Sequence, residues 1–288
     1  MCMTLEPSRM SSTILYAAET VFNDTLVHVM GYQNQAENLS KGPNAMLLPI
    51  PSSAPMGPGN AIDMRACKNV LKDYAVIVEA NRPRTRGMSK GFGDVDSLGD
   101  VQVFDSGSYT VVLAKDASGI DSALGQVPAN KRPASRPDIF AAYGKLYPGW
   151  HIALCCYDGA VEAEPMVWQY EPLDTSHLFA PGLDGHDGKI PNINASQVQR
   201  DHTVIVSMVN APVTKFAMRV TDPLEHRYYG ISGDTIPETH RYLFGKNFYG
   251  TKHTGSTLNG DFVFPIASMT GEFRVRSLSE YVVKPPGF

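Results

Sequence analysis

Glycine and proline interrupt this chain from end to end. Its 288 residues include 25 glycines and 21 prolines, and these are spread along the sequence instead of being pooled in one linker. Breaks of this frequency favour short strands and loops over long helices. The chain is therefore expected to consist of many short elements.

Composition limits the classes of protein that remain open. With 43% hydrophobic and 19% charged residues, the chain can bury a full core and falls at the upper edge of one domain or in the range of two. A net charge of -4 lacks the basic excess of a phosphate-backbone binder, so nucleic acid is not an expected partner. No apolar run is long enough for a membrane-spanning helix, and no membrane association is expected.

The opening residues, MCMTLEPSRM, do not have the charged and then apolar segments of a secretory leader. We therefore expect a soluble protein that stays in the cytoplasm, or in the host cytoplasm or virion if a virus encodes it. Four cysteines at irregular spacing predict neither a disulfide scaffold nor a zinc site. No cofactor or metal is expected.

The first third of the chain predicts strands with one helix. Residues 13–18 (TILYAA) and 26–32 (LVHVMGY) have the β-branched and aromatic content of paired strands around the turn VFND. Residues 45–48 in GPNAMLLPIP predict a third strand, which Pro49 and Pro51 end at a sheet edge because proline has no N–H.

Residues 62–71 have the apolar spacing of a short amphipathic helix, and residues 74–80 (YAVIVEA) predict a fully apolar strand. The segments 101–104 and 109–114 predict a strand pair around the turn DSGS.

The middle of the chain predicts two helices and two more strands. One helix starts near residue 118, and a clearer one covers residues 137–147, where Pro137 suits the first turn. The segments WHIALCCYD and PMVWQYEP predict strands. The neighbouring Cys155 and Cys156 must face opposite sides of their strand, so they cannot both enter one core.

These patterns predict an α+β fold with a mainly antiparallel sheet and two or three short helices. We expect an α+β core domain over residues 1–200 and a β-rich extended region or arm over residues 201–288, which includes strands at 203–209 and 215–220.

Several segments taken in order are similar to one family. The pieces are TILYAAE, VHVMGYQNQ, NAMLLPIP, VQVFDSGSYTVVLAKDASGIDSAL, YPGWHIALCCYDG and EPMVWQYEPLDTSHLFAP. Over about residues 12–181 they resemble the uncharacterised bacterial secreted proteins known as domain of unknown function 2330. This chain departs from that family because it shows no leader segment and continues past Arg200. The resemblance implies a fold and no activity.

Cys2 is the sharpest chemical candidate. If Met1 is removed, the α-amino group of Cys2, with a pKa near about 7.7, can act as the base for its own thiol. Amide hydrolases of the N-terminal-nucleophile class work in this way. Such an enzyme also needs an oxyanion donor and a substrate-orienting cation, for which Asn34, Asn81 and Arg82 are candidates. An inert structural cysteine is the alternative.

Two further polar segments could bind ligands. Arg82, Arg84 and Arg86 lie among glycines and could hold phosphate or an acidic partner, although a solvated loop explains the same residues. Oxygen and imidazole groups of the kind that bind metals occur close together in the sequence, but helical ligand spacing is absent and a polar turn is the favoured interpretation. These residues are His177, Asp184, His186, Asp187, Asp201 and His202.

Two hypotheses from different classes follow. The first is a non-catalytic binding or structural protein, virus- or phage-encoded in one version, that docks on a protein partner or self-assembles through its aromatic C-terminal region. It is favoured because no nucleophile elbow, phosphate loop or dinucleotide motif occurs in the sequence. The second is an amide hydrolase in which Cys2 is the nucleophile.

Overall fold

The computed structural model describes residues 3–80, 101–194, 197–209, 218–219, 236, 238–245, 247–269 and 278–287. Within these ranges the chain is strand-rich, with a few short helices and mainly antiparallel sheets. This confirms the predicted α+β class. None of the helices in the described ranges is both long and apolar enough to cross a bilayer.

A long hairpin forms the centre of the larger sheet. Strand β2 (Ser8–Phe22) turns at Asn23 and Asp24 into β3 (Thr25–Asn38). Both turn residues have positive φ, 48° and 61°, as a type I′ turn requires, and Asn and Asp tolerate this region better than other residues. The predicted strand pair is confirmed, and both strands are longer than their apolar segments.

The remaining elements follow the expected pattern of short pieces. The strands are β1 (Met3–Thr4), β4 (Asn44–Ile50), β5 (Ala61–Ile62), β6 (Val101–Ser106), β7 (Tyr109–Ala114), β8 (His151–Tyr157), β9 (Ala160–Glu162), β10 (Met166–Tyr170), β11 (His177–Ala180), β12 (Val198–Met208), β13 (Met218–Arg219), β14 (Asn247–Thr257), β15 (Asp261–Pro265) and β16 (Val282–Val283). The helices are α1 (Val70–Ala80), α2 (Ile120–Ala123), α3 (Pro137–Leu146) and α5 (Ile266–Met269), with 3-10 turns η1 (Pro58–Asn60), η2 (Ala117–Gly119), η3 (Leu124–Gln126), η4 (Glu238–Leu243) and η5 (Leu278–Tyr281).

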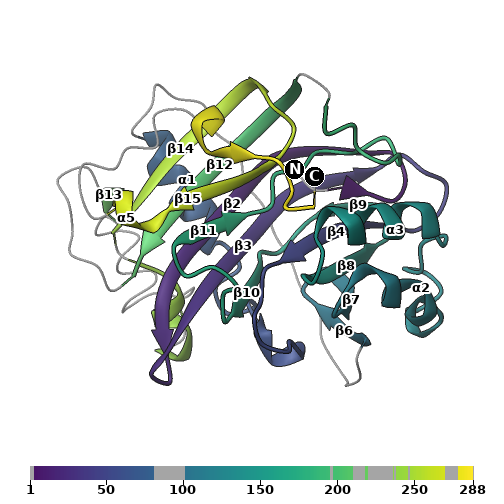
Figure 1. Cartoon of the computed structure of the whole chain (residues 1–288), viewed down its shortest axis with the longest axis horizontal. Coiled ribbons are helices and arrows are strands. Elements are labelled where there is room, and N and C mark those ends of the chain that lie inside the picture. Colours follow the sequence, from purple (N-terminus) through teal and green to yellow (C-terminus); the bar gives the residue numbers. More distant parts are fainter. Residues whose placement is uncertain are drawn as a thin grey trace.

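The strands form three sheets (Figure 1). The largest has eight strands in the order β13-β14-β12-β2-β3-β10-β5, with β9 beside β3. The second has five, in the order β1-β4-β8-β7-β6, and the third is β11-β15-β16. All strand pairs are antiparallel except β12 with β2, which run parallel.

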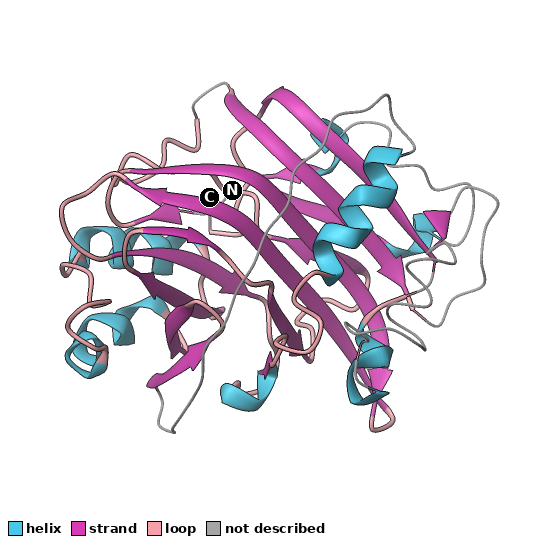
Figure 2. Cartoon of the chain, turned by 180° about the vertical axis from the view of Figure 1, so that it is seen from behind, coloured by secondary structure: helices cyan, strands magenta, loops and turns pink. Residues whose placement is uncertain are grey.

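The two larger sheets pack face to face with helices on both outer faces. The main core cluster lies between the sheets and joins, for example, Leu15 and Met30 of one to Leu48 and Val111 of the other. Helices α2 and α3 cover the outer face of the five-stranded sheet. Helix α1 crosses the outer face of the eight-stranded sheet (Figure 2), where η4 packs beside it. The architecture is therefore a four-layer α-β-β-α sandwich.

One part of the prediction is wrong. The predicted helix over residues 62–71 begins only at Val70, where α1 starts, and the segment predicted as a strand, 74–80, forms the last seven residues of α1. A seven-residue apolar run cannot be assigned to strand or helix by hydrophobicity alone. Spacing decides it here, because Tyr74, Ile77 and Val78 are buried on one side of α1 while Val76 is 57% exposed on the other.

The GPNAMLLPIP segment forms a fully buried strand. β4 pairs with β8 along its whole length, from Asn44↔Tyr157 to Ile50↔His151. On its other side β1 pairs only with Met46 and Leu47 and ends before Pro49. The strand continues through Pro49, so the expected stop at this residue is wrong. Proline is tolerated because one flank of β4 is unpaired there in the described structure.

The predicted strand around the cysteine pair is confirmed. Cys155 points into the core between the sheets and Cys156 into the core under α2 and α3, as alternation along a strand requires. The hairpin β6–β7 and helix α3, which begins at Pro137, also agree with the sequence.

Strand β12 crosses the expected domain boundary at residue 200. It pairs with β2 on one side and with β14 on the other. Phe262 and Phe264, from the expected C-terminal region, join the same core cluster as Leu15.

Candidate functional site

The first described residues form a short buried strand that is held on both sides. Met3 pairs with Leu47 of β4, and an isolated bridge joins it to Gly185 on the other side. The Thr4 N–H donates to the Gly185 carbonyl at 2.8 Å. Met3 and Thr4 are both 0% exposed. The chain is thus fixed in place at residue 3.

Four polar side chains lie close to this anchor, and we call them the amino-terminal polar cluster: Asp184, His186, Arg200 and His202. Asp184 and His186 flank Gly185, and their Oδ1 and Nδ1 atoms are 3.5 Å apart. Arg200 and His202 come from β12 and are 3% and 0% exposed. The negative charge of Asp184 acts on the pKa of Arg200, and the positive charge of Arg200 acts on that of His202. The four groups therefore form one electrostatic unit.

Arg200 ties together two loops. Its Nη2 donates to the carbonyls of Leu258 and Gly260 at 3.0 Å each, and its Nε and Nη1 donate to Thr257 Oγ1 and to the Gly182 carbonyl. The guanidinium carbon lies 5.0 Å from the centre of the Phe262 ring. Burial lowers the pKa of Arg200 to about 10, so it still carries its charge at neutral pH. Its role is to hold the loop after β11 against the β14–β15 turn.

Asp261 supports the same loop from the other side. Its Oδ1 accepts the N–H groups of Gly182 and Leu183 at 2.8 and 3.0 Å, and its Oδ2 accepts the Tyr147 hydroxyl at 2.6 Å. The residue is 1% exposed. Burial raises its pKa, and these hydrogen bonds oppose the rise because they stabilise the carboxylate.

His202 is held in the neutral form. Burial keeps its pKa well below the ordinary value, and the positive charges of Arg200, His186 and His253 act in the same direction. The imidazole therefore resists protonation and stays neutral beside the charge of Arg200.

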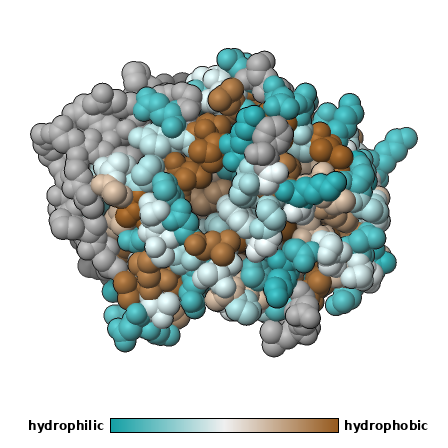
Figure 3. Space-filling view, in the orientation of Figure 1, coloured by the Kyte–Doolittle hydropathy of each residue, from teal (hydrophilic) through white to brown (hydrophobic). Residues whose placement is uncertain are grey.

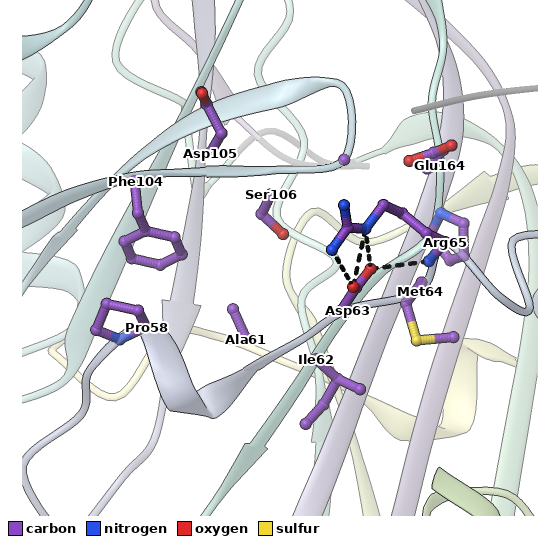
Figure 4. Close-up of a pocket in the computed structure, with 12 residues that line it drawn as sticks. Pro58, Ala61, Ile62, Asp63, Met64, Arg65, Phe104, Asp105, Ser106 and Glu164 are labelled. Carbon is purple, nitrogen blue, oxygen red and sulfur yellow. Dashed lines mark hydrogen bonds and ion pairs between the residues drawn. The ribbon is translucent and has the colours of Figure 1, made fainter. Parts of the chain in front are cut away.

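A second candidate is a pocket of about 50 Å³ (Figure 4). It lies where the β6–β7 turn meets the segments around β5 and β10. Glu164 and the Asp63–Arg65 ion pair lie at one end, and Phe104 and Pro58 lie at the other. Asp63 accepts from Arg65 Nε at 2.8 Å and from Nη2 at 2.6 Å. Glu164 is 3% exposed, and its Oε1 has no hydrogen-bond partner in the described structure.

The local sequence explains how Glu164 comes to be buried. Gln33 of β3 donates to the Ala163 carbonyl at 2.9 Å, and the Ala163 N–H donates to Asn34, so the residue before Glu164 is fixed to the sheet. Gly107 has φ +55° in the β6–β7 turn and lies directly over the carboxylate, since a Cβ there would be 3.1 Å from Glu164 Oε2. Burial raises the pKa of Glu164; Asp63 adds to this, and Lys68 and Arg65 oppose it.

A serine, a histidine and an aspartate also meet at the start of β11. Ser176 Oγ lies 2.8 Å from His177 Nδ1, and Asp174 Oδ2 lies 2.8 Å from the same nitrogen. In a nucleophilic triad the serine and the carboxylate contact different ring nitrogens. Here they share one, and Ser176 Oγ also donates to Asp174 at 2.5 Å. This is an exposed turn and not a triad.

The structure places few of the predicted site residues. Cys2, Asn81, Arg82, Arg84 and Arg86 lie outside the described residues. Asn34 is buried in the main core, where its Nδ2 donates to Met10 Sδ and Tyr32 Oη and its Oδ1 accepts from Tyr109 at 3.4 Å. These contacts hold its amide within the core.

The oxygen and imidazole groups considered for a metal do not gather in one place. Asp201 and His202 are consecutive on β12 and face opposite sides, and Asp201 accepts the Ser12 N–H on the outer side at 3.2 Å. Asp187 lies near Lys189 in an exposed turn. Across the described ranges, no three His, Cys, Asp or Glu side chains gather as metal ligands.

Three buried charged residues were not found from the sequence: Glu164, Arg200 and Asp261. Each lies beside or within a strand and belongs to no motif. One signal was present for Glu164, because AEP at 163–165 puts a charge just before the apolar segment MVW. Such charges have to be paired or functional.

Taken together, the fold and site define a four-layer α-β-β-α sandwich with a buried polar cluster beside its first strand. In comparisons with protein-family models, curated proteins and solved structures, the chain has no match. The resemblance to domain of unknown function 2330 therefore stays a prediction.

Proposed function

We propose that the protein is an N-terminal-nucleophile amide hydrolase with Cys2 as its nucleophile. The observation that carries the proposal is the anchoring of Met3 beside Gly185, between Asp184 and His186. Cys2 lies outside the described residues and is bonded to Met3 in the sequence.

The other cysteines support this choice. Cys67, Cys155 and Cys156 are each buried, with 0% exposure. Burial raises the pKa of Cys156 to about 12, so its thiol is protonated at neutral pH. Catalytic thiols are accessible and have a lowered pKa. Cys2 is the remaining cysteine of the chain.

The proposed reaction needs Cys2 to be the first residue, after loss of Met1 or of any longer segment before it. The neutral α-amino group takes the thiol proton, and the thiolate attacks the amide carbonyl carbon. As the C–N bond breaks, the leaving amine receives that proton and a thioester forms on Cys2. Water then hydrolyses the thioester, which releases the carboxylic acid and restores the thiol.

The cluster supports this chemistry in two ways. Arg200 and Asp261 hold the loop that carries Gly185, so they position the first strand without touching substrate. Arg200 keeps its positive charge in the cluster, and His202 stays neutral beside it. A positive surrounding lowers the pKa of a neighbouring amine or thiol, which favours the reactive forms at neutral pH.

Intact mass spectrometry and acylation trapping test the proposal. The purified protein is expected to start at Cys2 and to form a transient acyl adduct with p-nitrophenyl acetate, located on Cys2 by peptide mapping. Cys2→Ala is the variant that abolishes the adduct, and Cys67→Ala is the matched control that retains it. A chain that keeps Met1, or an adduct that persists in Cys2→Ala, contradicts the proposal.

The second candidate is the non-catalytic binding or assembly function, acting through the β-rich C-terminal region. It is supported by β16, which is the edge strand of the third sheet and leaves Val283 41% exposed, with Leu258 59% exposed. Hydrophobic patches reach the surface on the face in Figure 3, separated by hydrophilic residues. An open edge with apolar side chains can pair with another strand.

Light scattering after size-exclusion chromatography tests this candidate. Self-assembly predicts a mass above that of one chain, 31.4 kDa, and its reduction to a monomer in Val283→Asp. A monomer that retains no protein partner from its host argues against it. Capture of an anionic ligand by Arg82, Arg84 and Arg86 stays a prediction, which their joint replacement by Ser tests.

A further inference from the structure

The Glu164 pocket has the features of a binding site, and the amide-hydrolase proposal does not use it. The pocket is lined at one end by charged groups and at the other by Phe104 and Pro58 (Figure 4). A volume of about 50 Å³ is larger than the space of a single water and suits a group of a few heavy atoms.

The Glu164 carboxylate is the one feature in the pocket that lacks compensation. Glu164 is 3% exposed, and Oε1 has no hydrogen-bond partner among the described residues. A buried carboxylate oxygen without a donor is costly, because no hydrogen bond replaces its lost hydration. A ligand that brings N–H donors and positive charge removes this cost.

The neighbouring charged groups are committed elsewhere. Arg65 holds Asp63 through two nitrogens at 2.6 and 2.8 Å, so this pair is neutral as a unit. Asp105 turns away from the centre of the pocket and accepts the Thr110 hydroxyl at 2.5 Å. Lys68 partly offsets the charge of Glu164 and opposes the rise of its pKa, but Glu164 Oε1 has no hydrogen-bond partner in the described structure.

The apolar end of the pocket determines which chemical group the rest of the ligand can carry. Phe104 is 4% exposed and packs edge-on against Trp168, with ring centres 6.2 Å apart, so its position is fixed. An alkyl stem can lie against Phe104 and Pro58 while its charged head meets Glu164. A divalent metal fits less well, because no three ligating side chains gather there among the described residues.

We propose that this pocket binds the primary ammonium group of a small alkylamine, with Glu164 as the counter-ion. The ammonium head supplies the hydrogen bonds that Oε1 lacks, and the stem lies along the apolar wall. The groups that face Glu164 are Asp63, Arg65 and Lys68. Since the ligand is a cation and the site must be ionised, affinity falls as the pH is lowered through the raised pKa of Glu164.

Titration calorimetry with n-butylammonium at pH 8 tests the proposal. Saturable binding is expected in the intact protein, with an affinity about ten-fold or more weaker in Glu164→Gln, since one charged hydrogen-bonded contact has about this value. Tetramethylammonium, which has no N–H, is expected to bind at least about ten-fold more weakly than n-butylammonium. Glu171→Gln, an exposed carboxylate just after β10, is the matched control and is expected to leave the affinity unchanged.

A second variant keeps the test valid if Glu164→Gln is poorly folded. Ser106→Val fills the pocket from β6 without removing a charge, and it is expected to lower the affinity as well. Thermal unfolding of each variant shows whether it is folded. Equal affinity in the intact protein and both variants, no saturable binding of n-butylammonium, or binding of Mg²⁺ or Ca²⁺ in its place would overturn the proposal.

Discussion

Asp261 and Glu164 are two carboxyl groups that are buried to nearly the same extent but differ in their hydrogen-bond partners. They are 1% and 3% exposed, and burial raises the pKa of both. Asp261 accepts two backbone N–H groups and a tyrosine hydroxyl. Glu164 has an oxygen with no hydrogen-bond partner in the described structure.

This difference in hydrogen bonding distinguishes a carboxylate that stabilises the fold from one that can bind a ligand. The donors around Asp261 offset most of the cost of burial, and they join the loop after β11, helix α3 and strand β15. That loop carries Gly185 and anchors the first strand. No hydrogen bond offsets the cost of burying Glu164 Oε1. Protein folds tolerate such groups mainly where a ligand supplies the missing contact.

Asp261→Ala should give the largest effect on stability. It leaves the Gly182 and Leu183 N–H groups and the Tyr147 hydroxyl without their acceptor and opens a cavity in the core, and we expect a loss of about 3–5 kcal/mol. Urea unfolding followed by circular dichroism measures it. The control Asp174→Ala removes an exposed carboxylate and should cost under about 1 kcal/mol. A small loss for Asp261→Ala would remove the structural role.

Gly107→Ala should have an intermediate effect. Its φ of +55° disfavours a side chain by about 1–2 kcal/mol, and the new Cβ would be 3.1 Å from Glu164 Oε2. The same chemical unfolding experiment measures the cost. Gly125→Ala, where a Cβ meets nothing within 4 Å, is the control. If both variants are equally stable, the turn does not press on the carboxylate.

Glu164→Gln should have the smallest effect, and its sign depends on pH. The folded pKa of Glu164 is raised above its ordinary value of 4.5, so the folded state binds the proton more tightly than the unfolded state. This contribution to stability is complete below the ordinary pKa and is lost as the pH rises through the folded pKa. At pH 7.5 the glutamine variant should therefore be as stable as the native protein or more stable.

Thermal unfolding at pH 7.5 and pH 4.5 checks this prediction. When the pH is lowered from 7.5 to 4.5, the stability of Glu164→Gln relative to the native protein should decrease. The relative stability of Glu171→Gln should not change. A large loss of stability in Glu164→Gln at pH 7.5 would mean that the carboxylate has partners, as Asp261 does.

The sequence predicted the local features of the fold well. Asn23 and Asp24 predict their turn because few residues accept positive φ, and Pro137 predicts the start of α3 because its missing N–H suits a first turn. The opposite faces of Cys155 and Cys156 follow from strand alternation alone. YAVIVEA was misassigned because its contacts with β2 and β14, and not its apolar content, decide that it is helical.

The candidate sites depend on contacts between distant parts of the chain. Met3 meets Gly185, Arg200 meets Gly260, and Glu164 lies under Gly107. No local pattern contains such pairs, so sequence reasoning named Asp184, His186 and His202 only as candidate metal ligands and missed Arg200, Asp261 and Glu164. The layered fold brings these distant residues together, because it packs two sheets against each other and buries the residues at their edges.

The most direct test of the proposed function is the alkylation of the folded protein with iodoacetamide at pH 7, followed by intact mass and peptide mapping. The other three cysteines are fully buried, so a catalytic Cys2 predicts one fast modification, located on Cys2 and absent in Cys2→Ala. Under the same conditions in urea, every thiol should react. Slow alkylation of Cys2 in the folded protein, at the rate seen in urea or below it, would contradict the nucleophile proposal.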